Sequence, residues 1–478
     1  MRMKRKRLLP LIIAVALFIE NMDATAIATS LPMMAHDLGT EPIALKLALT
    51  AYLLALAVFI PVSGWIADRF GARPTFMSAI AVFLVGSLAC AASRSLETLV
   101  AARFLQGMGG ALMVPVGRLV LLRAIPKSEL VNALSWLTIP ALVAPMIGPP
   151  LGGFITTYFN WRWIFLVNLP MGALGIALAW RFIPDLREES TPLDWVGFLL
   201  SGAGLALAMF GFSTLGRHML SVPVAVTCLI LGLLALGGYV VHARRHPHPL
   251  LDLGLFKLAT FRAGVLGGSV FRIGIGAIPF LLPLMLQLGF GLNPLQSGLL
   301  TFASAMGAMF MKTIAARVLK RFGFRRVLWI NTLLCAALLA SYGLFRNDTP
   351  HIIIIGTLVI AGCFRSLQFT SLNAISYAEV DQRAMSQAAS LSGMMQQFSL
   401  GLGVAVAGYA LQIAGMFNGT APTAAGNFPP AFVMVAAVSA LSVWMMRALP
   451  AHAGHEMSGR AEPGREIAEP KAQQRPGT

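Results

Sequence analysis

Charged residues are scarce in this sequence. Only 12% of its 478 residues are Asp, Glu, Lys or Arg, whereas soluble globular proteins contain about 25%. Hydrophobic residues make up 57% of the chain, and the mean hydropathy is +0.75. The alternating segments of about ten residues that are typical of membrane β-barrels are absent from the sequence. The composition therefore predicts an all-α integral membrane protein and excludes a soluble fold.

Paired cysteines and nucleotide-binding loops are also missing. Four single cysteines lie within apolar runs, so neither a disulfide framework nor a zinc site is predicted: Cys90, Cys228, Cys335 and Cys363. None of the eight lysines follows a glycine, which excludes the phosphate-binding G-K-[ST] loop and ATP-driven export by this chain alone. The enzyme patterns H-E-x-x-H and G-x-S-x-G do not occur either. We expect no enzymatic activity, cofactor or metal, and we interpret His242, His246 and His248 as a solvated basic loop.

Acidic residues are outnumbered, with 19 Asp and Glu against 36 Lys and Arg. The net charge of +17 does not indicate nucleic-acid binding, because the cations stand in short clusters between apolar runs, where they set membrane topology. Most of these clusters fall on the side of the N-terminus. The positive-inside rule therefore predicts that both termini are cytoplasmic.

Apolar runs bounded by charges, Pro and Gly predict about fourteen membrane spans. Their approximate positions are 8–34, 45–66, 74–92, 97–122, 132–157, 162–183, 194–214, 220–241, 260–288, 295–316, 326–346, 351–374, 386–415 and 428–447. The basic stretch that precedes the first run resembles a secretory signal, but the run continues through Asp23 to Pro32 without a convincing cleavage site. We interpret it as a retained first helix.

One charged stretch between the second and third spans recurs in the second half of the chain. Residues 64–73 (GWIADRFGAR) share the pattern R-F-G-x-R with residues 316–325 (ARVLKRFGFR), at an offset of 252. Gly148 and Gly153 similarly correspond to Gly403 and Gly408, at an offset of 255. Two such matches predict parallel repeats, an architecture in which the substrate site lies between the halves.

The repeat predicts a division of the chain into four parts. Residues 1–183 and 260–449 would form two pseudo-symmetric six-helix bundles, and residues 184–259 a linker with two additional central spans. Residues 450–478 are polar and without periodicity, so we predict a disordered cytoplasmic tail.

Several stretches resemble the major facilitator superfamily, and within it the drug:proton antiporters with fourteen spans. They are the hinge at 64–73, Arg103 with Gln106, Gly107, Gly109 and Gly110 in span four, Gly148-Pro149 with Gly152-Gly153 in span five, residues 161–170 (WRWIFLVNLP), and residues 23–32 (DATAIATSLP) in span one. The chain departs from the family pattern at Ala28, where the family has Asn, and at Ala144, where it has Gly.

The resemblance implies export of small molecules, namely drugs, by exchange for protons across the bacterial inner membrane. It implies a cytoplasmic gate at Gly64, Asp68, Arg69, Gly71 and Arg73, an antiporter motif at Gly148, Pro149, Gly152 and Gly153, and a proton-relay role for Arg103. The proton gradient would be the energy source. A monomer in the lipid bilayer is expected, with periplasmic adaptor proteins as a further partner.

Acids inside the membrane are costly and usually functional. We place only Asp23 and Glu20 well inside a span, three residues apart and hence on one helical face. A carboxyl group in a low-dielectric cavity suits a proton carrier, because burial favours its neutral form. We therefore predict proton coupling at Asp23 and Glu20 with Arg103 as the countercharge. The alternative for each acid is a structural carboxylate.

Three cations in the second half have no acid on their own helices. Arg272 and Arg365, together with Gln106 and Thr25, are predicted to line the substrate cavity, whereas Lys312 is expected to extend toward the membrane surface. A cationic wall leaves open an alternative function, namely export of an anionic metabolite or metal chelate such as citrate or ferric citrate. We also expect Asp68 to pair with Arg73 across the hinge.

Overall fold

The computed structural model describes residues 2–125, 127–184, 192–215, 221–450 and 453–454, and its regular elements are helices. Within these ranges, thirteen helical segments are long and apolar enough to cross a membrane. The predicted fifth span corresponds to α6 (Lys127–Tyr158). This helix is not among the thirteen, and the burial of some of its side chains is not described. The predicted all-α membrane fold is confirmed.

The first half of the chain supplies six spans. They are built from α1 (Arg2–Ala26), η1 (Ile27–Ser30), α2 (Leu31–Asp37), α3 (Lys46–Phe70), α4 (Ala72–Ala92), α5 (Leu96–Ala124), α6, α7 (Trp163–Leu166) and α8 (Asn168–Phe182). The central pair is α9 (Trp195–Thr214) and α10 (Val222–Arg245), which pack against each other.

The second half supplies six more spans. The first of them is an α-helical span that contains two π-helical turns. This span consists of α11 (Ala259–Arg262), the π-helical turn η4 (Ala263–Gly267), α12 (Gly268–Gly276), α13 (Ile278–Leu284) and a second π-helical turn, η5 (Met285–Gly289). The others are α14 (Pro294–Phe322), α15 (Phe324–Ser341), α16 (His351–Ile375), α17 (Met385–Asn418) and the last pair, α18 (Phe428–Ala440) with α19 (Val443–Arg447).

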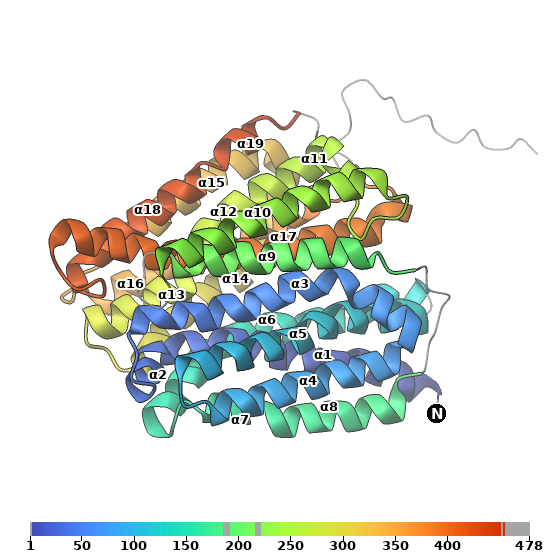
Figure 1. Cartoon of the computed structure of the whole chain (residues 1–478), viewed down its shortest axis with the longest axis horizontal. Coiled ribbons are helices and arrows are strands. Elements are labelled where there is room, and N and C mark those ends of the chain that lie inside the picture. Colours follow the sequence, from blue (N-terminus) through green and yellow to red (C-terminus); the bar gives the residue numbers. More distant parts are fainter. Residues whose placement is uncertain (1, 126, 185–191, 216–220, 451–452, 455–478) are drawn as a thin grey trace, which may run out of the picture.

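The long helices lie side by side, with the N-terminus at the right of Figure 1. The loops and helix ends on that side carry Arg69, Arg73, Arg123, Arg181, Arg244, Arg245, Lys257, Lys320, Arg321 and Arg325. We call this side the basic end and the other side the opposite end.

The repeated hinge has the same backbone conformation in both halves. Gly71 ends α3 with φ +98°, and Gly323 ends α14 with φ +77°. L-residues with side chains rarely adopt such angles, which explains glycine at both turns.

The second glycine pair makes similar contacts in the two halves. A Cβ atom on Gly148 of α6 would meet Thr25 of α1, and one on Gly403 of α17 would meet Ile273 and Gly276 of α12. Each glycine thus lets a late helix approach the first helix of its own half.

Five residues further along, each helix contacts the other half. A Cβ atom on Gly153 would overlap the backbone of Pro294, at the start of α14. The equivalent Gly408 faces Lys46, at the start of α3, with 2.6 Å between the position of that Cβ and the lysine Cδ atom. The halves therefore meet by exchanging equivalent contacts at the opposite end of the bundle.

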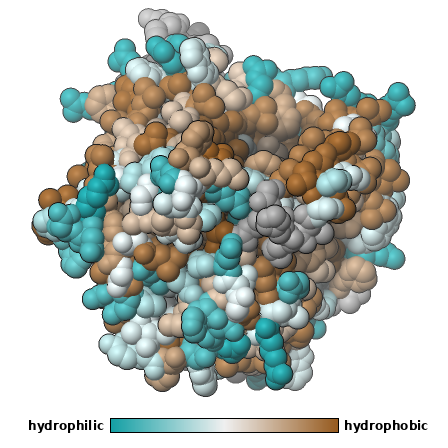
Figure 2. Space-filling model, turned by 60° about the vertical axis from the view of Figure 1, so that its left-hand side comes forward, coloured by the Kyte–Doolittle hydropathy of each residue, from teal (hydrophilic) through white to brown (hydrophobic). Residues whose placement is uncertain are grey.

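The outer surface suits lipid. Large apolar side chains are exposed on the flanks of the helices, including Trp180, Leu199, Leu234, Phe310, Ile352 and Trp444. Figure 2 shows broad hydrophobic areas on the flanks, with hydrophilic side chains gathered over the face turned forward. Lys312 is exposed on α14, as expected for a side chain that extends toward the membrane surface.

The central pair is tied to the following linker by Asp194, the N-cap of α9. Its carboxylate accepts hydrogen bonds from the backbone nitrogens of Gly197 (2.8 Å) and Leu250 (3.1 Å) and contacts Nε2 of His242 at 2.8 Å. Burial raises the pKa of Asp194, but these hydrogen bonds outweigh burial and hold the pKa below its ordinary value. The cap is therefore a carboxylate at neutral pH.

Two of the predicted segments fall largely outside the described residues. The charged stretch after the first half includes residues 185–191, and the predicted tail 450–478 is described only at Pro450, Ala453 and Gly454.

Candidate functional site

The centre of the first half holds a buried ion pair. Nη1 of Arg103, on α5, lies 2.6 Å from Oδ2 of Asp23, on α1, and the side chains are 1% and 0% exposed. Taking two charges out of water is costly, and hydrogen bonds from neighbouring groups offset part of that cost. The structure thus brings together the acid and the countercharge that were predicted as partners.

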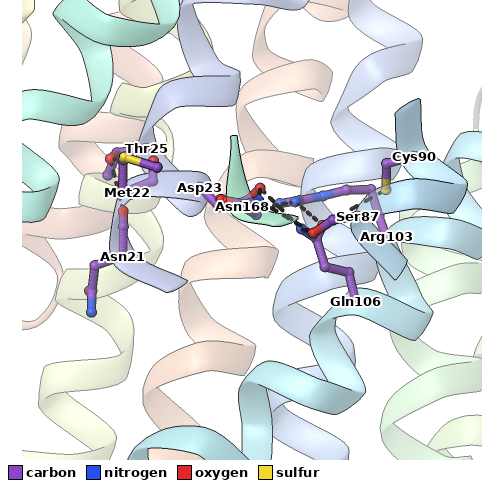
Figure 3. Close-up of polar contacts among 9 residues, drawn as sticks. All are labelled: Asn21, Met22, Asp23, Thr25, Ser87, Cys90, Arg103, Gln106 and Asn168. Atoms are coloured by element: carbon purple, nitrogen blue, oxygen red, sulfur yellow. Dashed lines mark hydrogen bonds and ion pairs between the residues drawn. The ribbon is translucent and has the colours of Figure 1, made fainter. Parts of the chain in front are cut away.

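Amide and hydroxyl groups complete the environment of Asp23. Oδ1 accepts hydrogen bonds from Nε2 of Gln106 (3.0 Å) and from Nδ2 of Asn168 (2.7 Å), and both amides also donate to Oγ of Ser87. Figure 3 shows these side chains converging on Asp23. We call Asp23, Ser87, Arg103, Gln106 and Asn168 the Asp23 network.

The network joins four helices that come from different parts of the first half of the sequence. α1 supplies Asp23, α4 supplies Ser87, α5 supplies Arg103 and Gln106, and Asn168 is the first residue of α8. The Arg103 guanidinium also lies over the ring of Tyr52 on α3, 4.3 Å from its centre. A change in the charge of Asp23 would therefore alter hydrogen bonds or ring contacts in every span of the first half except α6.

The second predicted acid has a different environment. Glu20 is 8% exposed, and its Oε2 atom has no hydrogen-bond partner among the described residues. Asp23 and Glu20 therefore lie on one helix without sharing the network. An unpaired polar atom in a buried place is costly.

Thr25 and Gln106 were predicted to line the substrate cavity, and the structure places both in other contacts. Gln106 is fully buried in the Asp23 network. Thr25 donates to the backbone oxygens of Asn21 and Met22 on its own helix. Figure 3 shows Thr25 directed away from the network.

The glycines of the predicted antiporter motif form a packing seam between three helices. Gly148 faces Thr25 and Gly152 faces the backbone oxygen of Ala26, so that α6 lies directly against α1. Gly153 faces Pro294 of α14, and the backbone oxygen of Pro149 faces Gly298 of the same helix. We call these contacts the α1–α6–α14 seam.

The two cations predicted for the far wall of the cavity differ in burial. Arg272 is 1% exposed, donates from Nη2 to Oδ1 of Asn373 (3.1 Å), and lies 5.6 Å from the centre of the Phe369 ring. Arg365 is half-buried and donates to Oγ of Ser304 at 2.8 Å. At the repeat offset of 252, Arg272 corresponds to Glu20, so a basic residue in the second half stands where the first half has an acidic one.

The hinge has a different ion pair from the one predicted. Asp68 pairs with Arg123, at the end of α5, with 2.6 Å between Oδ1 and Nη2. The predicted pairing of Asp68 with Arg73 is not found in the described part of the chain. The reason is that α3 and α5 pack along their lengths, which brings their ends together, whereas Arg73 belongs to the first turn of α4. Gly64 and Arg69 are exposed beside this pair.

This geometry predicts the effect of breaking the hinge contact. Asp68→Asn and Arg123→Gln should each slow turnover by about two- to fivefold, because a partly exposed ion pair contributes about 0.5–1 kcal/mol to one conformation. Substrate binding to purified protein should change less than the export rate. Arg69→Gln, an exposed neighbour, is the matched control. A larger loss from Arg73→Gln than from Arg123→Gln would contradict this assignment.

Sequence reasoning missed Ser87 and Asn168 as partners of Asp23. Asn168 stands in the stretch 161–170 that carries the family resemblance, and this was the available signal. Trp161 in the same stretch is fully buried and donates from Nε1 to Asp37 at 2.9 Å, while Arg162 contacts the same carboxylate at 3.0 Å. The stretch is thus built into the opposite end of the first half.

Comparison with known proteins agrees with this architecture. The model of the Major Facilitator Superfamily matches residues 13–278 and again residues 264–474. The chain belongs to this superfamily. The first matched segment extends through the central pair into the first span of the second half, and the second segment begins within that span. The family makes the chain a membrane transporter rather than an enzyme.

Relatives and solved structures extend over nearly the whole chain. The chain is 39% identical to the "Putative multidrug resistance protein MdtD" of Pectobacterium carotovorum, over 85% of this chain and 87% of the relative, and 37% identical to the protein of the same name from Escherichia coli O157:H7, over 84% and 86%. It resembles the structure of a D-xylose-proton symporter with a TM-score of 0.67 and 13% identity, over 92% and 97% of the two chains. A bacterial homologue of the lysosomal transporter Spinster gives a TM-score of 0.64 and 15% identity, over 96% and 99%.

Proposed function

We propose that this protein exports drugs from the cytoplasm in exchange for protons, by alternating access of a site between its halves. The Asp23 network carries the proposal. It provides one buried carboxylate whose ionised form is held by a cation and two amides, and whose protonation would release all of them. The names of the relatives support drugs as substrates, and they do not favour the alternative of an anion such as citrate.

The network supplies the energy coupling. In the present arrangement Asp23 is shielded from water and lies 2.6 Å from Arg103. A proton that reaches Asp23 removes the charge that holds Arg103, so it favours a conformation in which α1 and α5 are differently placed. Proton and substrate then compete through the conformational equilibrium, and such coupling is reciprocal.

The α1–α6–α14 seam supplies the mechanical connection. Asp23 lies two residues before Thr25, which packs on Gly148, and five residues further along α6 Gly153 packs on the second half. Small residues on both sides of a helix permit close sliding contacts. A displacement of α1 would therefore pass through α6 to α14, where the halves meet.

Two hydrogen bonds join the halves at the opposite end, and we infer that the transporter is closed there. Nε2 of Gln287 in η5 donates to the backbone oxygen of Thr29 at 2.8 Å, and the backbone nitrogen of Leu295 donates to Oγ1 of Thr157 at 3.1 Å. Both bonds join the first half to the second. With the basic end in the cytoplasm, we assign this closed side to the periplasm of a bacterial inner membrane, with both termini cytoplasmic.

The chain would consist of two moving bundles and a central pair of helices. Residues 1–183 and 260–449 would move against each other as the two bundles, while 184–259 carries the central pair of helices. The Asp23 network and the seam are complete within one chain, which favours a monomer as the functional unit.

Transport in proteoliposomes tests this function. Proteoliposomes with an acidic lumen should accumulate the lipophilic cation ethidium at clamped membrane potential, and the lumen should become more alkaline as ethidium enters, because protons leave in exchange. Liposomes with the Asp23→Asn variant are the matched control. Ethidium flux that is indifferent to the pH gradient would overturn proton exchange, and a gradient-driven flux of citrate instead would overturn the assignment of drugs.

A further inference from the structure

The base of the central pair gathers metal-binding side chains from two helices. One carboxylate and two imidazoles, those of Asp194, His242 and His246, place their ligand atoms within 4.8 Å of one another. Asp194 precedes α9, whereas His242 lies in the last turn of α10 and His246 caps that helix. These residues take no part in the Asp23 network or in the α1–α6–α14 seam.

The two histidines are placed in register by the helix. They stand four residues apart, so their side chains lie above one another on one face. Their ring centres are 5.1 Å apart and the ring planes are tilted by 31°. This spacing is common in metal sites built on one helix, as in the first two ligands of H-E-x-x-H proteins.

The carboxylate is held in position before any metal arrives. Asp194 is 6% exposed, and the backbone nitrogens of Gly197 and Leu250 each donate to one of its oxygens. Fixed hydrogen bonds of this kind orient metal-ligating carboxylates in known sites. Oδ1 lies 2.8 Å from Nε2 of His242. Two ligands of a tetrahedral zinc ion, each at about 2.0–2.2 Å, are about 3.3 Å apart, so only a small opening is needed.

From this arrangement we infer that Asp194, His242 and His246 bind a divalent transition-metal ion of the Zn²⁺, Co²⁺ or Ni²⁺ type. Two imidazoles and one carboxylate are the donor set that such ions prefer, whereas Ca²⁺ and Mg²⁺ favour oxygen ligands alone. Three protein ligands leave a fourth position for water.

Such an ion would fasten the linker to the central helices. Leu250 and Leu251 follow the histidines and are buried in one apolar cluster with Val58 of α3 and Leu391 of α17. Asp194 already binds Leu250 from one side, and Oη of Tyr239 binds the backbone of Leu251 from the other. The metal would therefore stiffen a segment that touches both halves of the transporter at the basic end.

Metal binding to the full-length protein tests the inference. The protein should be purified in detergent without a polyhistidine tag, stripped with a chelator, and titrated with Zn²⁺ by calorimetry and with Co²⁺ by visible absorption. We expect one high-affinity equivalent with a Co²⁺ spectrum of low coordination number. His242→Ala/His246→Ala should lower the affinity by at least tenfold, and Asp194→Asn, which keeps a capping oxygen, should also lower it.

The control is His351→Ala, because His351 is exposed at the opposite end of the bundle. Zn²⁺ should raise the melting temperature of wild type and of His351→Ala but not that of the double variant. Equal Zn²⁺ affinity in wild type and the double variant would overturn the site, as would the lack of any stoichiometric binding. These readouts require no transport, so they are independent of the proposed export function.

Discussion

Replacing Asp23 with Asn should abolish proton-driven export while leaving folded protein in the membrane. Asn keeps the shape of the side chain but cannot exchange a proton, so the coupling between the pH gradient and substrate is lost. Coupling free energies of about 1–3 kcal/mol correspond to about 5- to 150-fold in affinity. We therefore expect uphill accumulation of ethidium in proteoliposomes to fall by at least tenfold, whereas downhill exchange persists.

A loss of stability must be separated from a loss of coupling. Asp23→Asn leaves Arg103 as a buried cation without its anionic partner, which costs about 3–5 kcal/mol where a buried pair is broken. The double variant Asp23→Asn/Arg103→Met removes both charges and should recover much of the melting temperature, but not the export. Gradient-driven export by the double variant would show that Asp23 is not the coupling acid. Glu20→Gln measures the contribution of the second acid in the same assay.

The fold followed from the sequence because a membrane leaves few choices. Apolar runs of spanning length, bounded by charges, place each helix to within a few residues; for example, the span predicted at 351–374 is α16, His351–Ile375. The pairing of Asp23 with Arg103 was also predictable. Charges are rare inside the spans, and each buried charge requires a partner. Periodicity and charge thus determined both the architecture and the centre of the site.

Contacts that depend on helix rotation were not predictable. Asp68 was expected to bind Arg73, its neighbour along the chain, but Arg123 lies closer because α5 ends beside α3. Gln106 was placed in the cavity, although its amide is directed to Asp23 and Ser87. The contact between Asp194 and His242 was not predicted, because the two residues are 48 positions apart in the sequence. Each case requires the angle at which one helix packs on another, which hydropathy does not contain.

Two neighbouring glycines should respond differently to the same substitution. Gly152 faces the backbone oxygen of Ala26 within the first half, whereas Gly153 faces Pro294 of the second half. A methyl group at Gly152 forces α6 away from α1, and overpacking of this kind costs about 1–3 kcal/mol. Gly152→Ala should therefore lower the melting temperature and reduce export by at least tenfold. Gly237→Ala on α10 is the matched control, because a Cβ atom there meets nothing within 4 Å.

A methyl group at Gly153 disturbs only the contact between the halves. Its backbone neighbour on α14 can move away if the opposite end opens, so Gly153→Ala should shift the population toward the open state rather than unfold the protein. A shift of about 1.4 kcal/mol changes a two-state ratio tenfold. Labelling of Thr157→Cys from outside by an impermeant maleimide reports this opening, since Thr157 binds Leu295 across the interface. Faster labelling in Gly153→Ala than in Gly152→Ala, at a near-normal melting temperature, is the expected result. Equal labelling rates in both variants would mean that the seam does not connect α1 to the second half, and that the proton on Asp23 acts by another route.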